Sequence, residues 1–475
     1  MNIPQEFYFF AFPIFCIMAG IITLILLSGF SRYPKEPSFT SLGVALSTLF
    51  AAALMSIFTL LSYRGLEYRF LGASFVVDNL ALVSQIFICI LGIFTLIFSY
   101  WSPVGRLLSK PEIMPLFLTS VLGLILTVMT HEWITFFIGL ELSSLSLYVL
   151  VGYISSQKLS TEAAMKYFIT GSAGSAVLFM GSAFLYCATG SLHWAPLNYS
   201  ILSTLGLIFL FCGFGFKLSL VPFHFWTPDV YQGAPSILVA FMSSAVKFAF
   251  TLAFMRFINA SISPGFDYLN IILIVMIILS LVIGSILGLA HQSVKRILAY
   301  SSIANSGYIA IIFYHLLLDP SKTQLFTTAV LFLILYSLGT LGSYGILSFI
   351  ETDSDIFKYE IQGLGVQSPV LGSLLTLFLL STAGIPPLAG FIGKWQIFSL
   401  SLENYSPLLT TILILGSVLS FAYYLQIISR IWFYPTEEKL DLRHISSWSL
   451  LSVFICFILM MVIGYTGPIW MPKLF

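Results

Sequence analysis

Charged side chains are scarce in this sequence. Only 8% of its 475 residues are Asp, Glu, Lys or Arg, whereas an ordinary soluble domain carries roughly 25%. Because a water-facing surface cannot be built from so few charges, the composition excludes an ordinary soluble protein. The formal net charge is only +1, so the chain also lacks the basic excess expected of a nucleic-acid-binding protein.

The few cysteines form no recognisable site. None has the spacing of a C-x-x-C pair or of a Cys/His metal motif. The sequence also lacks a cysteine cluster for iron–sulfur ligation and a glycine loop for phosphate binding. All five cysteines fall inside apolar runs, where they are interpreted as small buried hydrophobic residues: Cys16, Cys89, Cys187, Cys212 and Cys456.

Long apolar runs are abundant, and 59% of the residues are hydrophobic. A helix of about 20 residues crosses a hydrocarbon core of roughly 30 Å, whereas barrel strands need only about 10 residues. The runs therefore predict an all-α polytopic membrane protein of about fourteen transmembrane helices. The predicted spans are residues 7–29, 42–62, 77–100, 113–130, 133–153, 163–188, 201–231, 235–257, 269–290, 297–318, 325–350, 367–400, 407–432 and 447–470.

Lys and Arg are divided unevenly between the predicted loops. With the N-terminus outside, the outside loops carry Arg64, Arg69, Arg256, Lys322 and Lys473. The inside loops then carry the larger set, which comprises Arg32, Lys35, Arg106, Lys110, Lys158, Lys295, Arg296, Lys358, Arg430, Lys439 and Arg443. The positive-inside rule therefore predicts that both termini face outside. Lys295 and Arg296 are interpreted as interfacial anchors.

Four lysines fall within the predicted spans, and one acid lies deep inside a span: Lys166, Lys217, Lys247, Lys394 and Glu141. A charge near the bilayer centre costs about 2.5–3.5 kcal/mol, so these side chains are expected to face protein or water. One glutamate cannot neutralise four lysines, which predicts that some lysines lose their proton part of the time and can carry protons. The alternative is that they form ion pairs between helices or reach the interface, and it applies best to Lys166, near a helix start.

Two predicted spans are interrupted near their middle. One has Lys217 followed by Pro222, and the other has Pro386-Pro387 followed by Lys394. Proline frees a backbone carbonyl, which a membrane tolerates only beside protein or a water-filled cavity. We therefore expect both breaks at mid-membrane depth, lining a polar cavity. His224, just beyond the first break, is either a member of a water-filled proton path or an ordinary core histidine.

Paired interruptions at corresponding places are typical of transporters built from inverted repeats. The predicted organisation places Lys217 and Lys247 in a first five-helix unit and Lys394 in a second, inverted one. The proposed boundaries are 1–112 for three N-terminal helices, 113–257 and 258–432 for the two five-helix units, and 433–475 for a C-terminal helix.

Three segments resemble the subunit N family of the proton-pumping NADH:quinone oxidoreductases, within the antiporter-like group. They are Gly215–Pro235, Lys295–Ser302 and Ala383–Lys394. In the first, Trp226-Thr-Pro-Asp-Val-Tyr231 stands where the related subunits M and L typically carry a Trp-Leu-Pro-Asp-Ala type of sequence. The resemblance covers nearly the whole chain.

The resemblance implies roles for the charged residues. Glu141 matches the acid of the fifth helix, and Lys217 matches its partner on the broken seventh helix. Lys247 matches the relay lysine of the eighth helix, and Lys394 the lysine of the broken twelfth helix. We predict that Glu141 and Lys217 approach to ion-pair distance or to a spacing of one water. Lys166 matches a lysine of the sixth helix and is, like His224, a further relay candidate.

The resemblance also implies a setting. Energy would come from electron transfer between NADH and a quinone on other subunits, which hold the FMN and iron–sulfur clusters, while this chain would bind no cofactor. Its partners would be subunit M, small membrane subunits and lipid, in a bacterial inner membrane.

Two other functions remain open at this point. The first is a subunit of a multi-subunit cation/proton antiporter, against which the sequence Val230-Tyr-Gln-Gly233 argues. The second is a purely structural membrane subunit. Against this second function stand the uncompensated lysines, because apolar residues would pack at least as well.

Overall fold

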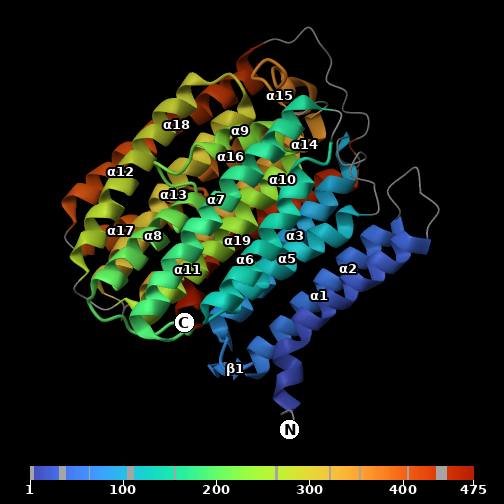
Figure 1. Cartoon of the computed structure of the whole chain (residues 1–475). Helices are drawn as coiled ribbons and strands as arrows, with labels where there is room; N and C mark the ends of the chain where they lie inside the picture. Colours follow the sequence, from blue (N-terminus) through green and yellow to red (C-terminus); the bar gives the residue numbers. More distant parts are fainter. Residues whose placement is uncertain are drawn as a thin grey trace.

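The computed structural model describes most of the chain as one bundle of roughly aligned helices (Figure 1). The described residues are 5–30, 39–63, 65–103, 112–154, 157–262, 266–319, 323–351, 355–403, 406–434, 445 and 447–474. Several cations used above to predict orientation lie outside the described residues, namely Arg32, Lys35, Arg64, Arg106, Lys110, Lys322, Lys439 and Arg443.

Eleven helices in the described residues are long and apolar enough to cross a membrane. They are α1 (Gln5–Phe30), α2 (Phe39–Ser62), α3 (Asn79–Trp101), α6 (Trp133–Val151), α7 (Lys158–Thr189), the continuous unit of α10 (Ser236–Phe241), the π-helix η1 (Met242–Val246) and α11 (Lys247–Ser261), then α12 (Asp267–Ala290), α13 (Val294–Leu318), α14 (Thr323–Ile350), α18 (Pro407–Phe433) and α19 (Ser447–Trp470).

The other three predicted spans coincide with shorter helices. One is α5 (Ile113–Met129), and the remaining two are the interrupted spans. The first interrupted span divides into α8 (Ile201–Lys217) and α9 (Trp226–Gly233), and the second into α16 (Pro369–Ala383) and α17 (Ala389–Glu403). The predicted all-helical membrane class and both breaks are confirmed, while the count of fourteen crossings and the repeat boundaries stay predictions.

Short elements complete the described chain. The strands β1 (Tyr68–Phe70) and β2 (Phe75–Val77) pair as an antiparallel hairpin before α3. The remaining elements are a single helical turn, α15 (Leu364–Gln367), and a closing 3₁₀ turn, η2 (Met471–Lys473).

Both ends of the chain lie at the same end of the bundle (Figure 1). The ring of Phe10 in α1 stacks on Tyr68 of the hairpin, with centroids 4.8 Å apart. Asn79, at the start of α3, donates to the carbonyl of Leu474 at 2.6 Å. We call this the terminal end, and the end where Ser236 and Glu351 meet the opposite end.

Burial separates the helices into an inner and an outer group. In the most apolar stretch of Ser236–Ser261 every residue is buried, but in α1, α2 and α19 only 33% are. The outer helices present large apolar side chains outward, such as Ile22, Phe50 and Ile455. Such apolar surfaces suit contact with lipid, because lipid tails are as apolar as these side chains and burial within the protein would add little stability. The helix that begins at Lys247 is therefore one of the innermost.

Close packing between α5 and α6 determines the position of Glu141. A Cβ at Gly123 of α5 would lie 2.5 Å from the backbone nitrogen of Ser143 in α6, and a Cβ at Gly139 would lie 2.8 Å from Thr127. Only glycine allows the two backbones this approach, as is typical of membrane helix pairs. The contact fixes the rotation of α6, and thereby the direction in which Glu141 leaves it.

Candidate functional site

The first helix break begins immediately after Lys217. Its freed backbone groups are satisfied by side chains from neighbouring helices, as the membrane interior requires. The carbonyl of Leu218 accepts from Ser306 of α13 at 2.5 Å, and the amide of Val221 donates to Ser280 of α12 at 2.9 Å. The break is therefore held in one conformation by hydroxyl groups.

Lys217 is buried and donates to Ser144 of α6 at 3.0 Å. Ser144 lies one helical turn beyond Glu141. The Lys217 ammonium and the Glu141 carboxylate are therefore close enough to interact electrostatically. No ion pair joins Glu141 to Lys217, although both are described, and the Oε1 atom of Glu141 is buried without a hydrogen-bond partner. The direct ion pair predicted from sequence is thus replaced here by a serine contact, while a spacing of one water stays a prediction.

Glu141 also borders a surface. It is half-buried and shares one face of α6 with the exposed residues Ile134, Ile138, Leu145 and Val149. These positions follow each other at intervals of three or four residues, which is the spacing of one helix face. We call these four residues the α6 stripe. A carboxylate at its edge needs a polar neighbour, because a charge left toward lipid is costly.

Lys247 is the most buried of the three lysines Lys217, Lys247 and Lys394, with a relative exposure of 2%. Its Nζ donates to the carbonyl of Ser302 at 2.8 Å, to the Ser302 hydroxyl at 2.6 Å and to Ser306 at 2.7 Å. Ser302 also accepts from Tyr336 of α14 at 2.9 Å. All these partners are neutral, and an uncharged amine could accept from a serine hydroxyl instead. The same pocket can therefore hold the lysine with or without its extra proton.

The second break places Lys394 beside Tyr308 of α13, on a different face of that helix from the two serines that bind Lys247. The Nζ of Lys394 donates to the carbonyl of Ala383 at 2.9 Å and stands 4.8 Å from the centre of the Tyr308 ring. The Tyr308 hydroxyl is 2.6 Å from that of Ser417 in α18. These side chains border a cavity of about 240 Å³ whose remaining lining is mostly apolar. The prediction of a polar cavity at this break was wrong, because most of the side chains of α17 and α18 that line the cavity beside Lys394 are large and apolar.

Glycine makes this second break possible. Gly384 adopts a φ of +87°, a conformation that side chains rarely allow. A Cβ at Gly390 would lie 1.8 Å from the carbonyl oxygen of Ser381, closer than any real contact. The amide of Gly390 instead donates to the Ser381 hydroxyl at 3.0 Å. The start of α17 therefore touches the end of α16 directly.

Lys166 is an ion-paired lysine. Its Nζ lies 2.7 Å from Glu162 and 2.6 Å from Asp229, and Asp229 also binds Arg296. The Lys166 side chain is 41% exposed. The ion-pair alternative raised from sequence is confirmed for this residue. Asp229, which falls inside the predicted span 201–231, was not predicted as a partner, because one sequence contains no signal that pairs it with a lysine 63 residues away.

Lys295 is not an interfacial anchor, and that interpretation was wrong. Its side chain is 0% exposed, and it pairs at 2.8 Å with Glu351, which is 1% exposed. Lys295 also donates to the carbonyl of Ala234, where α9 ends, and Glu351 accepts from the amide of Ser236, where α10 begins. Each charge thus matches the helix end it touches. The error arose because α13 begins earlier than predicted, while Glu351 directly follows a predicted span.

Loop residues at the opposite end are also buried. Lys358, assigned above to an inside loop, donates to Gln426 of α18 at 2.7 Å. Burial, and then the nearby charge of Arg430, lower the pKa of Lys358. Asp355 accepts from Gln232 of α9 at 2.5 Å. This segment therefore ties the end of the first broken helix to the rest of the bundle.

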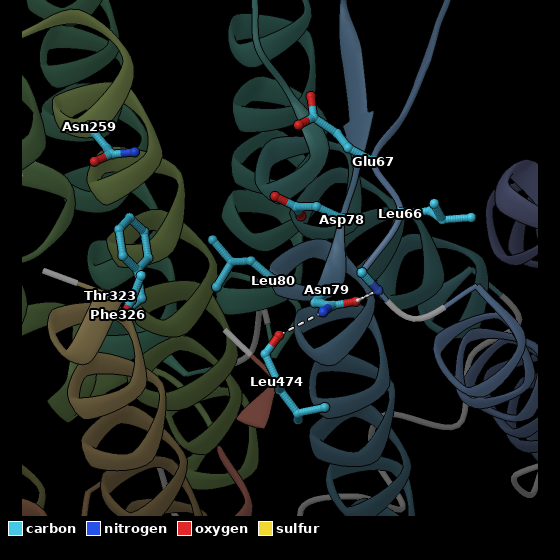
Figure 2. A pocket seen from close by; sticks show the side chains of 10 residues that line it. Leu66, Glu67, Asp78, Asn79, Leu80, Asn259, Thr323, Phe326 and Leu474 are labelled. Atoms are coloured by element: carbon cyan, nitrogen blue, oxygen red, sulfur yellow. Dashed lines mark hydrogen bonds between the residues drawn. The ribbon is translucent and has the colours of Figure 1, made fainter. Parts of the chain in front are cut away.

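The terminal end contains a polar pocket of about 320 Å³. Figure 2 shows Asn79 among the residues that line it, and Asn79 is hydrogen-bonded to Leu474 and to Gly65. Asp78 also lines it and accepts from Arg256 at 2.7 Å. Arg256, assigned from sequence to an outside loop, is in fact a buried residue of α11.

His224 is not joined to the lysines. It lies half-buried in the first break, and its Nδ1 has no hydrogen-bond partner. Among the hydrogen bonds of the described residues, none connects His224 with Lys217 or Lys247. The structure therefore gives no added support to a relay role for this residue.

Helix α13 is the element that the separate sites share. Ser302 and Ser306 bind Lys247, and Ser306 also binds the first break. Tyr308 faces Lys394, while Ser301 is hydrogen-bonded to Tyr424 of α18. The segment Lys295–Ser302, which carried part of the resemblance, contains Ser301 and Ser302, whereas Ser306 and Tyr308, further along the same helix, were not predicted from the sequence.

Comparison with known proteins identifies the family. Residues 130–420 match the family described as NADH:quinone oxidoreductase/Mrp antiporter, transmembrane. The NADH-quinone oxidoreductase subunit N of Maricaulis maris (strain MCS10) is 31% identical over 90% of this chain and 88% of its own length. The chain belongs to the subunit N family of NADH-quinone oxidoreductases. Another member, subunit N 1 of Aquifex aeolicus (strain VF5), is 33% identical over 77% of this chain and 78% of its own length.

Solved structures agree with membership of the subunit N family. A chain of respiratory complex I from Thermus thermophilus has a TM-score of 0.84 and 29% identity, covering 97% of this chain and 99% of that one. A chain of the Mrp complex from Dietzia sp. DQ12-45-1b has a TM-score of 0.83 at 16% identity, over 99% of this chain and 96% of its own. The second likeness shows a shared fold alone. The resemblance stated from three segments is thus confirmed, as is the predicted class of a membrane subunit of a proton-translocating NADH-quinone oxidoreductase.

Proposed function

We propose that this subunit N family member moves protons across the membrane through Lys217, Lys247 and Lys394, under the control of Glu141. The redox steps that drive it would occur on other subunits, which would hold the NADH, FMN, iron–sulfur and quinone sites of the complex. This chain itself would bind none of them.

The contacts of Ser306 carry the proposal. Its hydroxyl lies 2.7 Å from the Nζ of Lys247 and 2.5 Å from the carbonyl of Leu218, the residue next to Lys217. The Ser306 side chain thus contacts both Lys247 and the helix break that begins after Lys217. Hydroxyl groups can accept and donate at once, which suits proton transfer between the two lysines.

Glu141 would act as the control element. A unit charge that comes within about 4 Å of a lysine changes the energy of its protonated form by about 4 kcal/mol at an effective dielectric near 20. Lys217 now binds neutral Ser144, so Glu141 has room to approach it or to withdraw. A small shift of this carboxylate would therefore cause Lys217 to take up or release a proton.

The second half of the route would run from Lys247 to Lys394 along α13. Ser302 on this helix binds Lys247, and Tyr308 lies under Lys394. With both termini outside, protons would be taken up at the opposite end, pass Lys217 or Lys247, and leave from Lys394 at the terminal end. Two inverted units, 113–257 and 258–432, would each supply half of this path. Lys166, ion-paired as it is, would serve to hold α7 against α9 rather than to carry protons.

Neighbouring membrane subunits would complete the site. The α6 stripe and the half-buried carboxylate of Glu141 suit a protein surface that brings a polar group to the acid. Antiporter-like subunit M and the small membrane subunits are the expected partners, in a bacterial inner membrane.

A reconstituted system tests this function. Vesicles carrying the complete complex would be assayed for proton uptake and for NADH oxidation, with Lys217→Ala beside the unmodified chain. A positioned proton-transfer group typically contributes about 100-fold or more, so we expect proton uptake per assembled complex to fall at least about tenfold. Lys158→Ala, an exposed lysine at the opposite end, is the matched control. Full pumping by the assembled Lys217→Ala complex would refute the proposed route.

A further inference from the structure

Two polar contacts lie along the packed faces of α13 and α17. In the first, Lys394 of α17 stands over the ring of Tyr308 of α13. In the second, the Nε2 atom of His315 of α13 is 3.1 Å from the hydroxyl of Ser401 of α17. His315 follows Tyr308 by seven residues, and Ser401 follows Lys394 by seven. Seven residues are about two helical turns, so the second contact lies about 10 Å further along the same faces.

Both helices run toward the terminal end. His315 is only 1% exposed, but Leu318, three residues later, is already 44% exposed. Asp319 follows one turn after His315, and it is half-buried where α13 ends. His315 is therefore a buried titratable ring between Lys394 and the protein surface at the end where protons would leave.

We propose that His315 carries the proton from Lys394 to the outside, with Ser401 orienting its ring. The inference rests on the proposed function, because it needs Lys394 to release protons toward the terminal end. The Lys394 ammonium would give a proton, through water along the α13 and α17 faces, to one ring nitrogen of neutral His315. The other ring nitrogen would release its proton to water at the surface, and a return of the ring to its first tautomer would complete the cycle.

A purely structural histidine would be a weaker account of this position. The hydrogen bond to Ser401 helps to secure the ring, yet a leucine at the same place would fill a buried helix contact without any polar group to satisfy. The register of His315 with Tyr308, and of Ser401 with Lys394, places the second contact about 10 Å beyond the first on the same packed faces, in the direction of the proposed exit.

The test uses the complete complex in vesicles at matched NADH concentration and matched amounts of assembled complex. His315→Gln keeps a side chain that can bind Ser401 but cannot take up a proton at neutral pH. We expect its proton uptake per assembled complex to fall at least threefold, with a matching fall in coupled NADH oxidation that an uncoupler does not restore. His193→Gln is the control, because His193 is an exposed histidine at the same end. Normal pumping by assembled His315→Gln would overturn the inference.

Two further variants separate the possible failures. If His315→Gln does not assemble, Ser401→Ala decides, since it removes the orienting hydroxyl and keeps the ring: slowed pumping supports the inference and unchanged pumping overturns it. Lys394→Ala is measured in the same vesicles. Normal pumping in Lys394→Ala would refute the proposed function, whereas its loss beside normal His315→Gln would refute only the role of His315.

Discussion

The buried pair of Lys295 and Glu351 allows a quantitative test of why charges lie inside this protein. Both side chains are at most 1% exposed, with 2.8 Å between Nζ and Oε1. Removing one partner leaves the other charge buried, which typically costs about 3–5 kcal/mol. Replacing both by apolar residues of similar volume is typically neutral or stabilising by roughly 1–4 kcal/mol. Glu351→Leu and Lys295→Met should therefore each destabilise, and the double variant Lys295→Met/Glu351→Leu should recover.

The helix ends reduce that recovery. Glu351 accepts from the amide of Ser236 at 2.9 Å, and Lys295 donates to the carbonyl of Ala234. A charge at a helix terminus contributes about 0.3–1 kcal/mol, and both contributions disappear in the double variant. Subtracting them from the gain of apolar replacement leaves the double variant between about 2 kcal/mol less stable and about 3 kcal/mol more stable than the unmodified chain.

The assay is the fraction of intact complex on a native gel after heating membranes over a series of temperatures. Each single variant should lower the midpoint by several degrees, and the double variant should lie close to the unmodified complex. Lys158→Met, which changes an exposed lysine, should leave the midpoint unchanged. A double variant as unstable as the sum of both single changes would refute the reasoning, because each charge would then depend on partners other than the opposite one.

Three further outcomes follow from the site. Lys247→Arg should abolish pumping because a guanidinium stays charged, whereas Lys247→His should retain part of it; proton uptake per NADH oxidised distinguishes them. Glu141→Gln should lower coupled activity strongly with assembly intact, and loss of the complex on a native gel would instead indicate a structural role. Gly390→Ala should reduce the amount of assembled complex, since a Cβ there meets the Ser381 carbonyl oxygen at 1.8 Å; a normal amount would show that α17 can shift.

Hydropathy and proline placement were sufficient to predict the helices and both breaks. In lipid every backbone group must be satisfied within the protein, so the mid-span prolines near Lys217 and Lys394 indicated breaks, whereas Pro13 and Pro468, nearer the ends of their runs, lie within continuous helices. Lys217, Lys247 and Lys394 could be found for the same reason, because a charge within such a run has few alternatives to a buried role. These inferences needed no knowledge of which helices are neighbours.

The partners of the charges could not be predicted in this way. Lys295 and Glu351 lie at the ends of apolar runs, where a charged residue is ordinarily assumed to reach water. Only the packing of α10 against α14 shows that both are buried. The neutral partners of Lys247 likewise come from serines more than fifty residues away in sequence, and one sequence contains no signal that pairs them.

The π-helix η1, Met242–Val246, ends where Lys247 begins. A π turn holds one residue more than an α turn, so the backbone ladder here contains an insertion relative to a regular helix. Each residue of an α-helix turns the chain by about 100°, so one extra residue in a regular helix would rotate α11 by that angle relative to α10. The wider π turn takes up the extra residue instead, and α11 keeps the direction that points Lys247 at Ser302 and Ser306. A deletion of Ser244 that turns η1 into a regular α-helical turn would thus preserve the contacts of Lys247, whereas a second insertion beside it would rotate the lysine away from both serines.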